Sequence, residues 1–181
     1  IKVGVFFILF VPLVMHSHFF FPFIVVKNVL FRIGVELIAF LYLMLVIFDS
    51  NYRPRWNKLI LTVLAYVSVA AVASLFGIGL YRSFWGNYER MAGLFHLIHL
   101  VLFLFVIFNT FKFRKDWHQF LTFSVFVSTV MTFFALAQWL EVPFLMRSAG
   151  GQRLSGTVGS AAFFPAYLLF NLFFIFYFWA K

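Results

Sequence analysis

The chain consists largely of apolar runs of about 20 residues, separated by short segments that carry most of its charges. A helix of that length crosses the hydrocarbon core of a bilayer, which is about 30 Å thick. Hydrophobic residues make up 65% of the 181 residues, and only 10% are charged. A soluble domain of this size could not bury so much apolar surface. The sequence therefore predicts an integral membrane protein.

Six apolar runs qualify as spans and predict an all-α fold, a polytopic transmembrane helical bundle forming a single domain over residues 1–181. The predicted spans are residues 3–25, 28–48, 59–80, 92–111, 120–140 and 161–180. Because the chain starts at Ile1 and stops at Lys181, directly after an apolar run, we interpret it as the N-terminal part of a longer protein.

The basic residues predict the orientation. Lysine and arginine collect in the cytoplasmic loops of membrane proteins. A cytoplasmic N-terminus puts two basic loops, residues 49–58 and 112–118, on the inner side. The net charge of +9 then reflects topology and contact with anionic membrane lipids, so nucleic acid is not an expected partner.

The predicted outer side also carries several cations, which the orientation rule does not explain. They are Lys27, Arg32, Arg82, Arg90, Arg147 and Arg153, and the acids on that side are Glu36, Glu89 and Glu141. Charged groups at membrane depth are costly and often mark a functional site. These residues are therefore the candidates for binding an anion.

The first candidate segment runs from Pro22 to Glu36. Pro22 is expected to end or kink the first helix. Arg32 and Glu36 are four residues apart, so they can form a structural pair on one helix face. One interpretation is that this pair is internal and that Lys27 extends to lipid headgroups. The other is that Lys27 and Arg32 line an outward-facing anion site.

The second and third candidate segments are loops. Trp85 and Tyr88 are either interface anchors or, with Arg82 and Arg90, part of a phosphate- or sugar-binding surface. The loop at residues 147–160 holds four glycines and Arg153, and it lacks the ending of a Walker A motif. It is either an anion-binding turn before a helix or a flexible loop with a helix cap at Ser160.

The histidines do not predict a metal site. His96 and His99 share a helix face, but a metal site usually needs a third ligand, and the chain has no cysteine. We expect no metal and no cofactor. The expected role of these histidines is polar contact inside the bundle, for example with Gln138 or Asn171.

Three motifs together resemble the N-terminal half of the bacterial O-antigen ligase family. They are Phe-Pro-Phe at residues 21–23 followed by Lys27, Arg32 and Glu36; Ser-Phe-Trp-Gly-Asn-Tyr-Glu-Arg-Met at residues 83–91 followed by Gly93; and Arg-Leu-Ser-Gly-Thr-Val-Gly at residues 153–159. Family members often continue the last motif as Gly-Asn-Pro, whereas Ser160 and Ala161 stand here.

The resemblance implies a metal-independent glycosyltransferase of the bacterial inner membrane. Such an enzyme takes a glycan from undecaprenyl diphosphate on the outer face and passes it to a lipid A core, a protein or a polymer. The family's known catalytic groups lie in its second half, so the catalytic residues of this chain are unknown and the chain alone is expected to be inactive. The substrate-binding candidates are Lys27, Arg32, Arg82, Arg90, Arg153, Trp85 and Tyr88.

Two other classes of protein fit the same residues. A multi-pass transporter or flippase for an anionic lipid or sugar would also use outer cations. Transporters often have internal repeats and polar sites at the membrane midplane, whereas no repeat is evident here and the polar motifs lie at the outer rim. A structural membrane subunit would tolerate replacement of every outer arginine.

Overall fold

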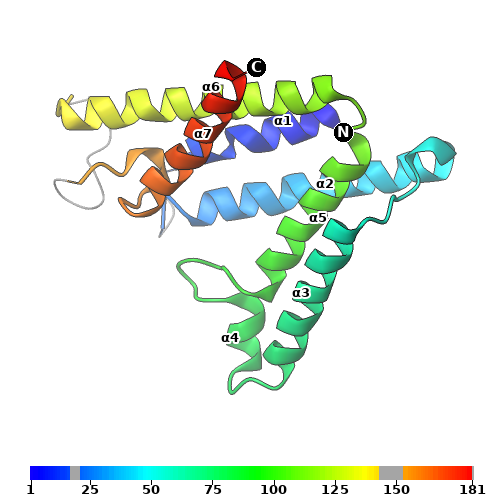
Figure 1. Ribbon diagram of the computed structural model, residues 1–181. Coiled ribbons are helices and arrows are strands. Elements are labelled where there is room, and N and C mark those ends of the chain that lie inside the picture. The colour runs from blue at the N-terminus through cyan, green and yellow to red at the C-terminus, as the bar shows by residue number, and fades with distance from the viewer. Residues whose placement is uncertain (17–20, 143–152, 181) are drawn as a thin grey trace. The chain divides into compact units, whose positions relative to one another are not determined.

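The computed structural model describes residues 1–16, 21–142 and 153–180, and within these ranges it is helical without β-strands (Figure 1). The elements are α1 (Lys2–Phe10), η1 (Val11–Leu13), α2 (Val25–Phe48), η2 (Ser50–Tyr52), α3 (Lys58–Leu75), α4 (Leu80–Trp85), α5 (Leu94–Thr110), α6 (Arg114–Trp139), η3 (Gly156–Val158) and α7 (Phe163–Trp179), where η denotes a short 3₁₀ turn. The all-α prediction is confirmed.

Three of these helices, α2, α3 and α6, are long and apolar enough to cross a membrane. They coincide with the second, third and fifth predicted spans. The other apolar helices are shorter, at Lys2–Leu13, Leu94–Thr110 and Phe163–Trp179. A helix of 17 residues, such as α5 or α7, is about 25 Å long, which is less than the hydrocarbon thickness. Of the six predicted spans, three are therefore matched by helices long enough to cross a membrane among the described residues, and six spans are not confirmed.

Proline and glycine explain where the predicted spans break. In the first span, Pro12 lies in η1, and the regular α-helix ends before it at Phe10. In the third span, α3 ends at Leu75, and a short bend containing Gly77 and Gly79 leads into the separate helix α4. In the sixth span, the helix starts at Phe163, so Ser160 is not its cap.

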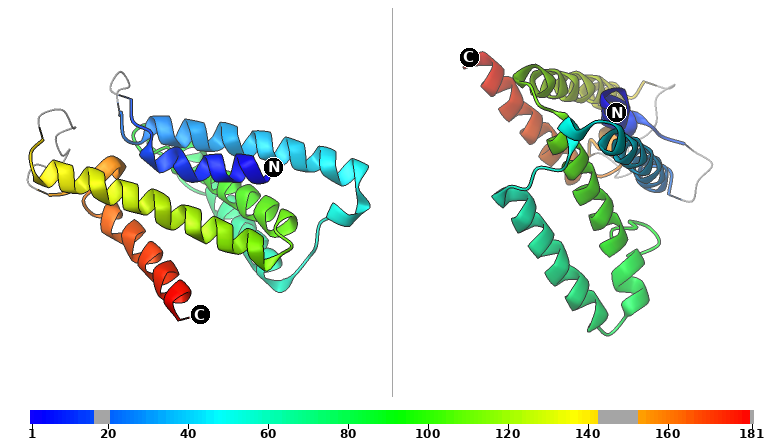
Figure 2. Two further views of the ribbon diagram at one scale, coloured as in Figure 1. Left: turned by 90° about the horizontal axis from the view of Figure 1, so that it is seen from above. Right: turned by 90° about the vertical axis from the view of Figure 1, so that its right-hand side faces the viewer.

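The chain divides into two compact units, residues 1–8 with 28–112, and residues 9–27 with 113–181. We call them unit 1 and unit 2. In unit 1, the first eight residues lie along α2 (Figure 2). This packing depends on two glycines: a Cβ atom on Gly4 would lie 2.5 Å from Ile38, and one on Gly34 would lie 3.0 Å from Ile8. The helices α3, α4 and α5 pack on one another in the same unit.

An apolar cleft of about 320 Å³ lies between α3 and α5 in unit 1. Its wall is made of aliphatic and aromatic side chains from both helices, including Ile60 and Val67 of α3 and Val101 and Phe105 of α5. Few residues of α3 are buried, so most of this helix presents apolar side chains to the surroundings. This exposure is what a lipid environment would stabilise.

Unit 2 is built around α6. Its core consists of Val127, Met131 and Ala135 of α6 with Phe164 of α7, and the turns η1 and η3 pack against the same helix. A buried hydrogen bond also joins the two helices: the hydroxyl of Ser124 donates to Asn171 Oδ1 at 2.8 Å. Polar pairs of this kind stabilise helix contacts in an apolar surrounding.

Candidate functional site

The loop between α4 and α5 is closed by two glycines in unit 1. Gly86 has a φ of 81°, and a Cβ atom there would lie 2.7 Å from the backbone nitrogens of Ala92 and Gly93. A Cβ atom on Gly93 would in turn collide with the carbonyl oxygen of Phe84. Only glycine allows the two ends of the loop to approach this closely. The closure fixes the backbone carbonyls of Arg90 and Met91.

Three polar side chains on α2 form a stripe, because Asn28, Arg32 and Glu36 are spaced four residues apart. The Asn28 Nδ2 group donates a hydrogen bond of 2.7 Å to the carbonyl oxygen of Arg90. Arg32 Nη2 donates one of 2.6 Å to the carbonyl oxygen of Met91. The stripe therefore holds the loop at residues 84–93 against the start of α2.

Arg32 is the buried cation of this cluster. Only 7% of its surface is exposed, and its guanidinium carbon lies 5.0 Å from the centre of the Phe95 ring. Its Nε atom is buried and has no hydrogen-bond partner among the described residues. A carbonyl oxygen and an aromatic face carry only partial negative charge. The guanidinium therefore keeps donor capacity and positive charge that an anion could use.

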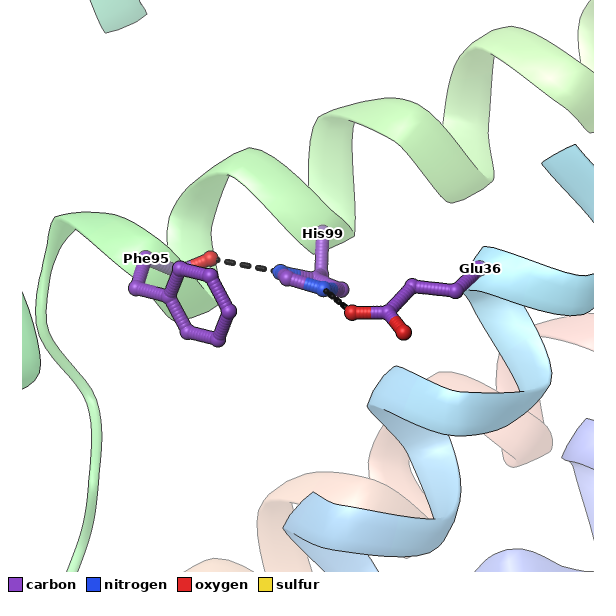
Figure 3. A network of polar contacts seen from close by, with 3 residues as sticks. All are labelled: Glu36, Phe95 and His99. Atoms are coloured by element: carbon purple, nitrogen blue, oxygen red, sulfur yellow. Dashed lines mark hydrogen bonds and ion pairs between the residues drawn. The ribbon is translucent and has the colours of Figure 1, made fainter.

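Glu36 pairs with His99 rather than with Arg32. His99 Nε2 lies 3.0 Å from Glu36 Oε1, and His99 Nδ1 lies 2.7 Å from the carbonyl oxygen of Phe95 (Figure 3). The imidazole is buried, with 6% of its side chain exposed, whereas 59% of the Glu36 side chain is exposed. Arg32 and Glu36 are both on α2 with the predicted i, i+4 spacing, but the carboxyl group of Glu36 points toward α5 and contacts His99 there. Glu36 still attracts Arg32 electrostatically.

The second histidine, His96, stands beside the Phe31 ring, with 5.6 Å between the ring centres. Its Nδ1 atom is buried without a hydrogen-bond partner in the described part of the chain. Within that part, no group of three or more metal-ligating side chains comes together. The expected partners of these histidines are engaged elsewhere: Gln138 bonds to Gly156, and Asn171 bonds to Ser124.

The loop residues predicted to bind substrate differ in exposure. Trp85 packs on Phe95 with 5.0 Å between ring centres and is 42% exposed, whereas Tyr88 is 84% exposed. Arg82 Nε donates a 3.0 Å hydrogen bond to the side-chain oxygen of Asn87. The side chain of Arg90 is exposed at the end of the same loop.

The start of the first candidate segment and the third candidate segment meet in unit 2. The Lys27 ammonium donates a hydrogen bond to the carbonyl oxygen of Thr157. Gly159, with a φ of 76°, contacts the Phe23 ring so closely that a Cβ atom would collide with it. The backbone N–H of Gly156 donates to Gln138 Oε1 at 3.0 Å. The turn that follows Arg153 is thus held by Phe23 and by Lys27 in the first turn of α2.

Contacts inside each unit thus join the predicted residues in two groups. In unit 1, Arg32 contacts the loop that carries Tyr88 and Arg90 and that directly follows α4, the helix of Arg82 and Trp85. In unit 2, Lys27 contacts the turn after Arg153. Arg153 is exposed, and residues 143–152, which include Arg147, lie outside the described residues.

Sequence reasoning missed Asn28 and the link from Glu36 to His99. The four-residue spacing of Asn28, Arg32 and Glu36 was a signal for the first of these.

Comparisons of this chain with protein-family models, with curated proteins and with solved structures find no match.

Proposed function

We propose that this chain is the carrier-binding part of an integral-membrane glycosyltransferase of the O-antigen ligase kind. In this proposal the chain crosses the bacterial inner membrane six times and has its N-terminus in the cytoplasm. The enzyme takes a glycan from undecaprenyl diphosphate on the outer face and passes it to a lipid A core, a protein or a polymer.

The environment of Arg32 is the observation that carries the proposal. A buried arginine normally needs a carboxylate partner, because an unpaired charge in an apolar surrounding is costly. Here the guanidinium contacts a carbonyl oxygen and an aromatic face, and its Nε atom has no hydrogen-bond partner among the described residues. A phosphate group carries negative charge, and two of its oxygens can accept parallel hydrogen bonds from the planar guanidinium of such an arginine.

The contacts between the motifs give independent support. The sequence motifs that carry the family resemblance are far apart in the chain, yet they meet in pairs: Arg32 with Met91 and Lys27 with Thr157. Within each unit, such contacts hold a candidate side chain in a defined position.

The chemistry follows from the charge that develops during transfer. When the bond between the sugar and the carrier breaks, negative charge grows on the leaving diphosphate, and fixed cations stabilise it. In unit 1, Arg32 and Arg90 are the proposed cations, with Arg82 in a supporting position; Lys27 and Arg153 are the candidates in unit 2. The exposed rings of Trp85 and Tyr88 suit the apolar face of a sugar, and the apolar helices suit the carrier's hydrocarbon tail.

The decisive experiment compares three variants of the whole protein in bacterial membranes. Arg32→Ala removes the cation, Arg32→Lys keeps the charge but not the planar fork, and Arg114→Ala removes an exposed arginine at the start of α6 as a matched control. Transfer of a radiolabelled glycan from undecaprenyl diphosphate is measured at equal protein abundance. Loss of one electrostatic donor is expected to lower the rate of transfer by about 100-fold in Arg32→Ala.

We expect a smaller loss in Arg32→Lys and none in Arg114→Ala. Equal rates in Arg32→Ala and the unaltered protein, with both correctly folded, would falsify the assignment of Arg32. Movement of an anionic lipid or sugar across the membrane without any glycan transfer would instead support a transporter.

A further inference from the structure

The apolar cleft of unit 1 ends at a basic segment of the chain. Helices α3 and α5 pack side by side, and the residues that line the cleft between them are aliphatic or aromatic (Figure 1). Trp56, which lies just before the start of α3, is one of these lining residues. Its ring centre lies 6.1 Å from that of Phe105 on α5. The same segment carries the cations Arg53, Arg55 and Lys58.

Hydrogen bonds hold this segment at the ends of the two helices that form the cleft. The backbone N–H of Arg55 donates to Asn109 Oδ1 at 2.7 Å, in the last turn of α5. The side-chain oxygen of Asn57 accepts from the backbone N–H of Ile60 at 2.9 Å and thereby caps α3. The backbone between these two residues, which includes Trp56, is therefore fixed at the entrance of the cleft.

A fourth cation holds the preceding turn in place. Lys112 Nζ donates to the carbonyl oxygen of Asn51 at 2.9 Å and lies 3.5 Å from the centre of the Tyr52 ring. The hydroxyl of Tyr42 on α2 donates to the carbonyl oxygen of Tyr52 at 2.9 Å. The loop between α2 and α3 is therefore bound both to α2 and to the residue that follows the end of α5.

The other three cations have no such task. The exposed side chains of Arg53, Arg55 and Lys58 form no hydrogen bond or ion pair with another described residue. The acid of the same loop, Asp49, accepts a hydrogen bond of 2.9 Å from the backbone N–H of Asn51 and caps the turn η2. The loop therefore presents positive charge that is available to an anion next to an apolar cleft.

The cleft is open and has the dimensions of a lipid chain. Two of its lining residues, Trp56 and Ile98, are 62% and 42% exposed. Its lining on α3 runs from Ile60 to Val67, which corresponds to about 10 Å along the helix axis. The chains of one bilayer leaflet extend over about 15 Å, half of the hydrocarbon core. A chain that starts at the basic segment would therefore follow the cleft within a single leaflet.

We propose that the cleft and the basic segment bind one anionic phospholipid of the membrane, with its phosphate at Arg55 and Lys58 and an acyl chain between α3 and α5. Hydrocarbon suits the cleft because its lining offers no polar side chain that would need a partner. A negatively charged headgroup suits the cations at its entrance. In the orientation predicted from the sequence, this entrance faces the cytoplasmic leaflet, whose surface is negatively charged.

This lipid site is separate from the site of the proposed function. It uses the last turns of α5, whereas Arg32 contacts Phe95 at the beginning of that helix. Failure of either proposal therefore leaves the other standing.

The expected strength follows from the two cations. One basic residue near an anionic headgroup raises the affinity by about fivefold, so two residues should raise it by about 30-fold. A zwitterionic lipid with the same acyl chains gains little from these charges. The preference for an anionic over a zwitterionic lipid therefore measures the contribution of the basic segment, and the binding of both lipids measures the contribution of the cleft.

The test uses the whole protein in detergent micelles with equal amounts of phosphatidylglycerol and phosphatidylcholine that have identical acyl chains. Native mass spectrometry counts the molecules of each lipid that remain bound. The double variant Arg55→Gln with Lys58→Gln removes the cations, and Arg82→Gln is the matched control. Arg82 is an exposed cation on α4, which follows the far end of α3, a helix about 27 Å long.

We expect the unaltered protein and Arg82→Gln to retain phosphatidylglycerol with about 30-fold preference, and the double variant to retain the two lipids about equally. Equal retention of both lipids by the unaltered protein would overturn the inference. A preference that persists after the loss of both cations would also overturn it.

A second pair of variants tests the cleft. Val67→Trp fills the cleft with a larger side chain and should abolish retention of both lipids. Val69→Trp adds the same ring at a position of α3 that is 68% exposed and is not among the lining residues, so it should leave retention unchanged. Equal lipid retention by these two variants would show that the chain does not occupy the cleft.

Cross-linking locates the chain without any substitution. Phosphatidylglycerol with a photoreactive diazirine in one acyl chain is irradiated with the unaltered protein, and the labelled peptides are identified by mass spectrometry. We expect labels on lining residues such as Val63 of α3 and Leu102 of α5. Labels confined to other helices would overturn the inference even if Val67→Trp failed to fold.

Discussion

The Lys27 ammonium donates a hydrogen bond to the carbonyl oxygen of Thr157, and so connects two segments 130 residues apart in the chain. This bond lies in unit 2, where Gly159 of the same turn contacts Phe23. A lysine at a helix start is usually expected to extend to lipid headgroups. Here it is directed into a turn, and its bonding partner is a main-chain carbonyl.

Replacing Lys27 is expected to loosen this turn. Lys27→Met keeps the aliphatic stem but leaves the Thr157 carbonyl without its donor, which should lower the free energy of unfolding by about 1–3 kcal/mol. Lys115→Met, an exposed position at the start of α6, should change it little. Denaturant titration of both variants in detergent micelles measures the difference. Equal stability of the two variants would show that the bond contributes nothing.

The closed loop at residues 84–93 predicts a sharp difference between two glycines. In Gly93→Ala the new Cβ atom would collide with the Phe84 carbonyl oxygen, so we expect a loss of about 2–3 kcal/mol in unfolding free energy. In Gly79→Ala the nearest atom, Arg82 Cβ, is 3.8 Å away. That variant should lose less than about 1 kcal/mol. Thermal unfolding in micelles compares them, and a similar melting temperature for both would contradict the close approach.

The Ser124–Asn171 hydrogen bond predicts energetic coupling between α6 and α7. A double-mutant cycle of Ser124→Ala and Asn171→Ala should give a coupling energy of about 1 kcal/mol, because buried polar pairs between membrane helices contribute about that much. Pairing Asn171→Ala instead with Thr129→Val, whose hydroxyl bonds to its own helix, should give additive effects. Additive effects in the first cycle would show that the Ser124–Asn171 hydrogen bond does not stabilise the contact between α6 and α7.

Trp85 and Tyr88 should behave differently although both are loop aromatics. Trp85 packs on Phe84 and Phe95, so Trp85→Ala is expected to lower stability by about 1–2 kcal/mol. Tyr88 is 84% exposed, so Tyr88→Ala should leave stability unchanged. If Tyr88 contacts the sugar as proposed, its removal should still raise the KM for the carrier-linked glycan. Stability is measured by thermal unfolding and KM by glycan transfer at varied donor concentration.

Much of the helical architecture was predictable because lipid imposes a simple rule on sequence. Backbone groups in an apolar medium must bond within their own segment, so a long apolar run becomes a helix. The span predicted at residues 28–48 agrees with α2 to within a few residues at both ends. The span predicted at residues 120–140 agrees with the end of α6, which begins earlier, at Arg114. The breaks at Pro12 and near Gly77 were less evident, because apolar side chains continue through them and hide the change in backbone geometry.

The partners of the polar residues were much harder to predict. Arg32 and Glu36 have the spacing of a helical ion pair. Nothing in that spacing indicates that the carboxyl group of Glu36 contacts His99 instead. The sequence also does not indicate that Arg32 reaches Met91 or that Lys27 reaches Thr157. Such contacts depend on how helices rotate and pack, and small residues such as Gly93 and Gly159 determine how closely the backbones approach.

The sequence by itself determined that this chain is helical, that it has the apolar character of a membrane protein, and which segments carry its polar groups. These properties depend on composition and on spacing along one helix, which can be read locally. The tertiary structure alone decided that Glu36 faces His99, that Arg32 is buried beside Phe95 with a donor to spare, and that Lys27 bonds to Thr157. The physical reason is that a hydrogen bond between distant segments requires a donor and an acceptor to meet within about 3 Å, and only packing fixes that distance.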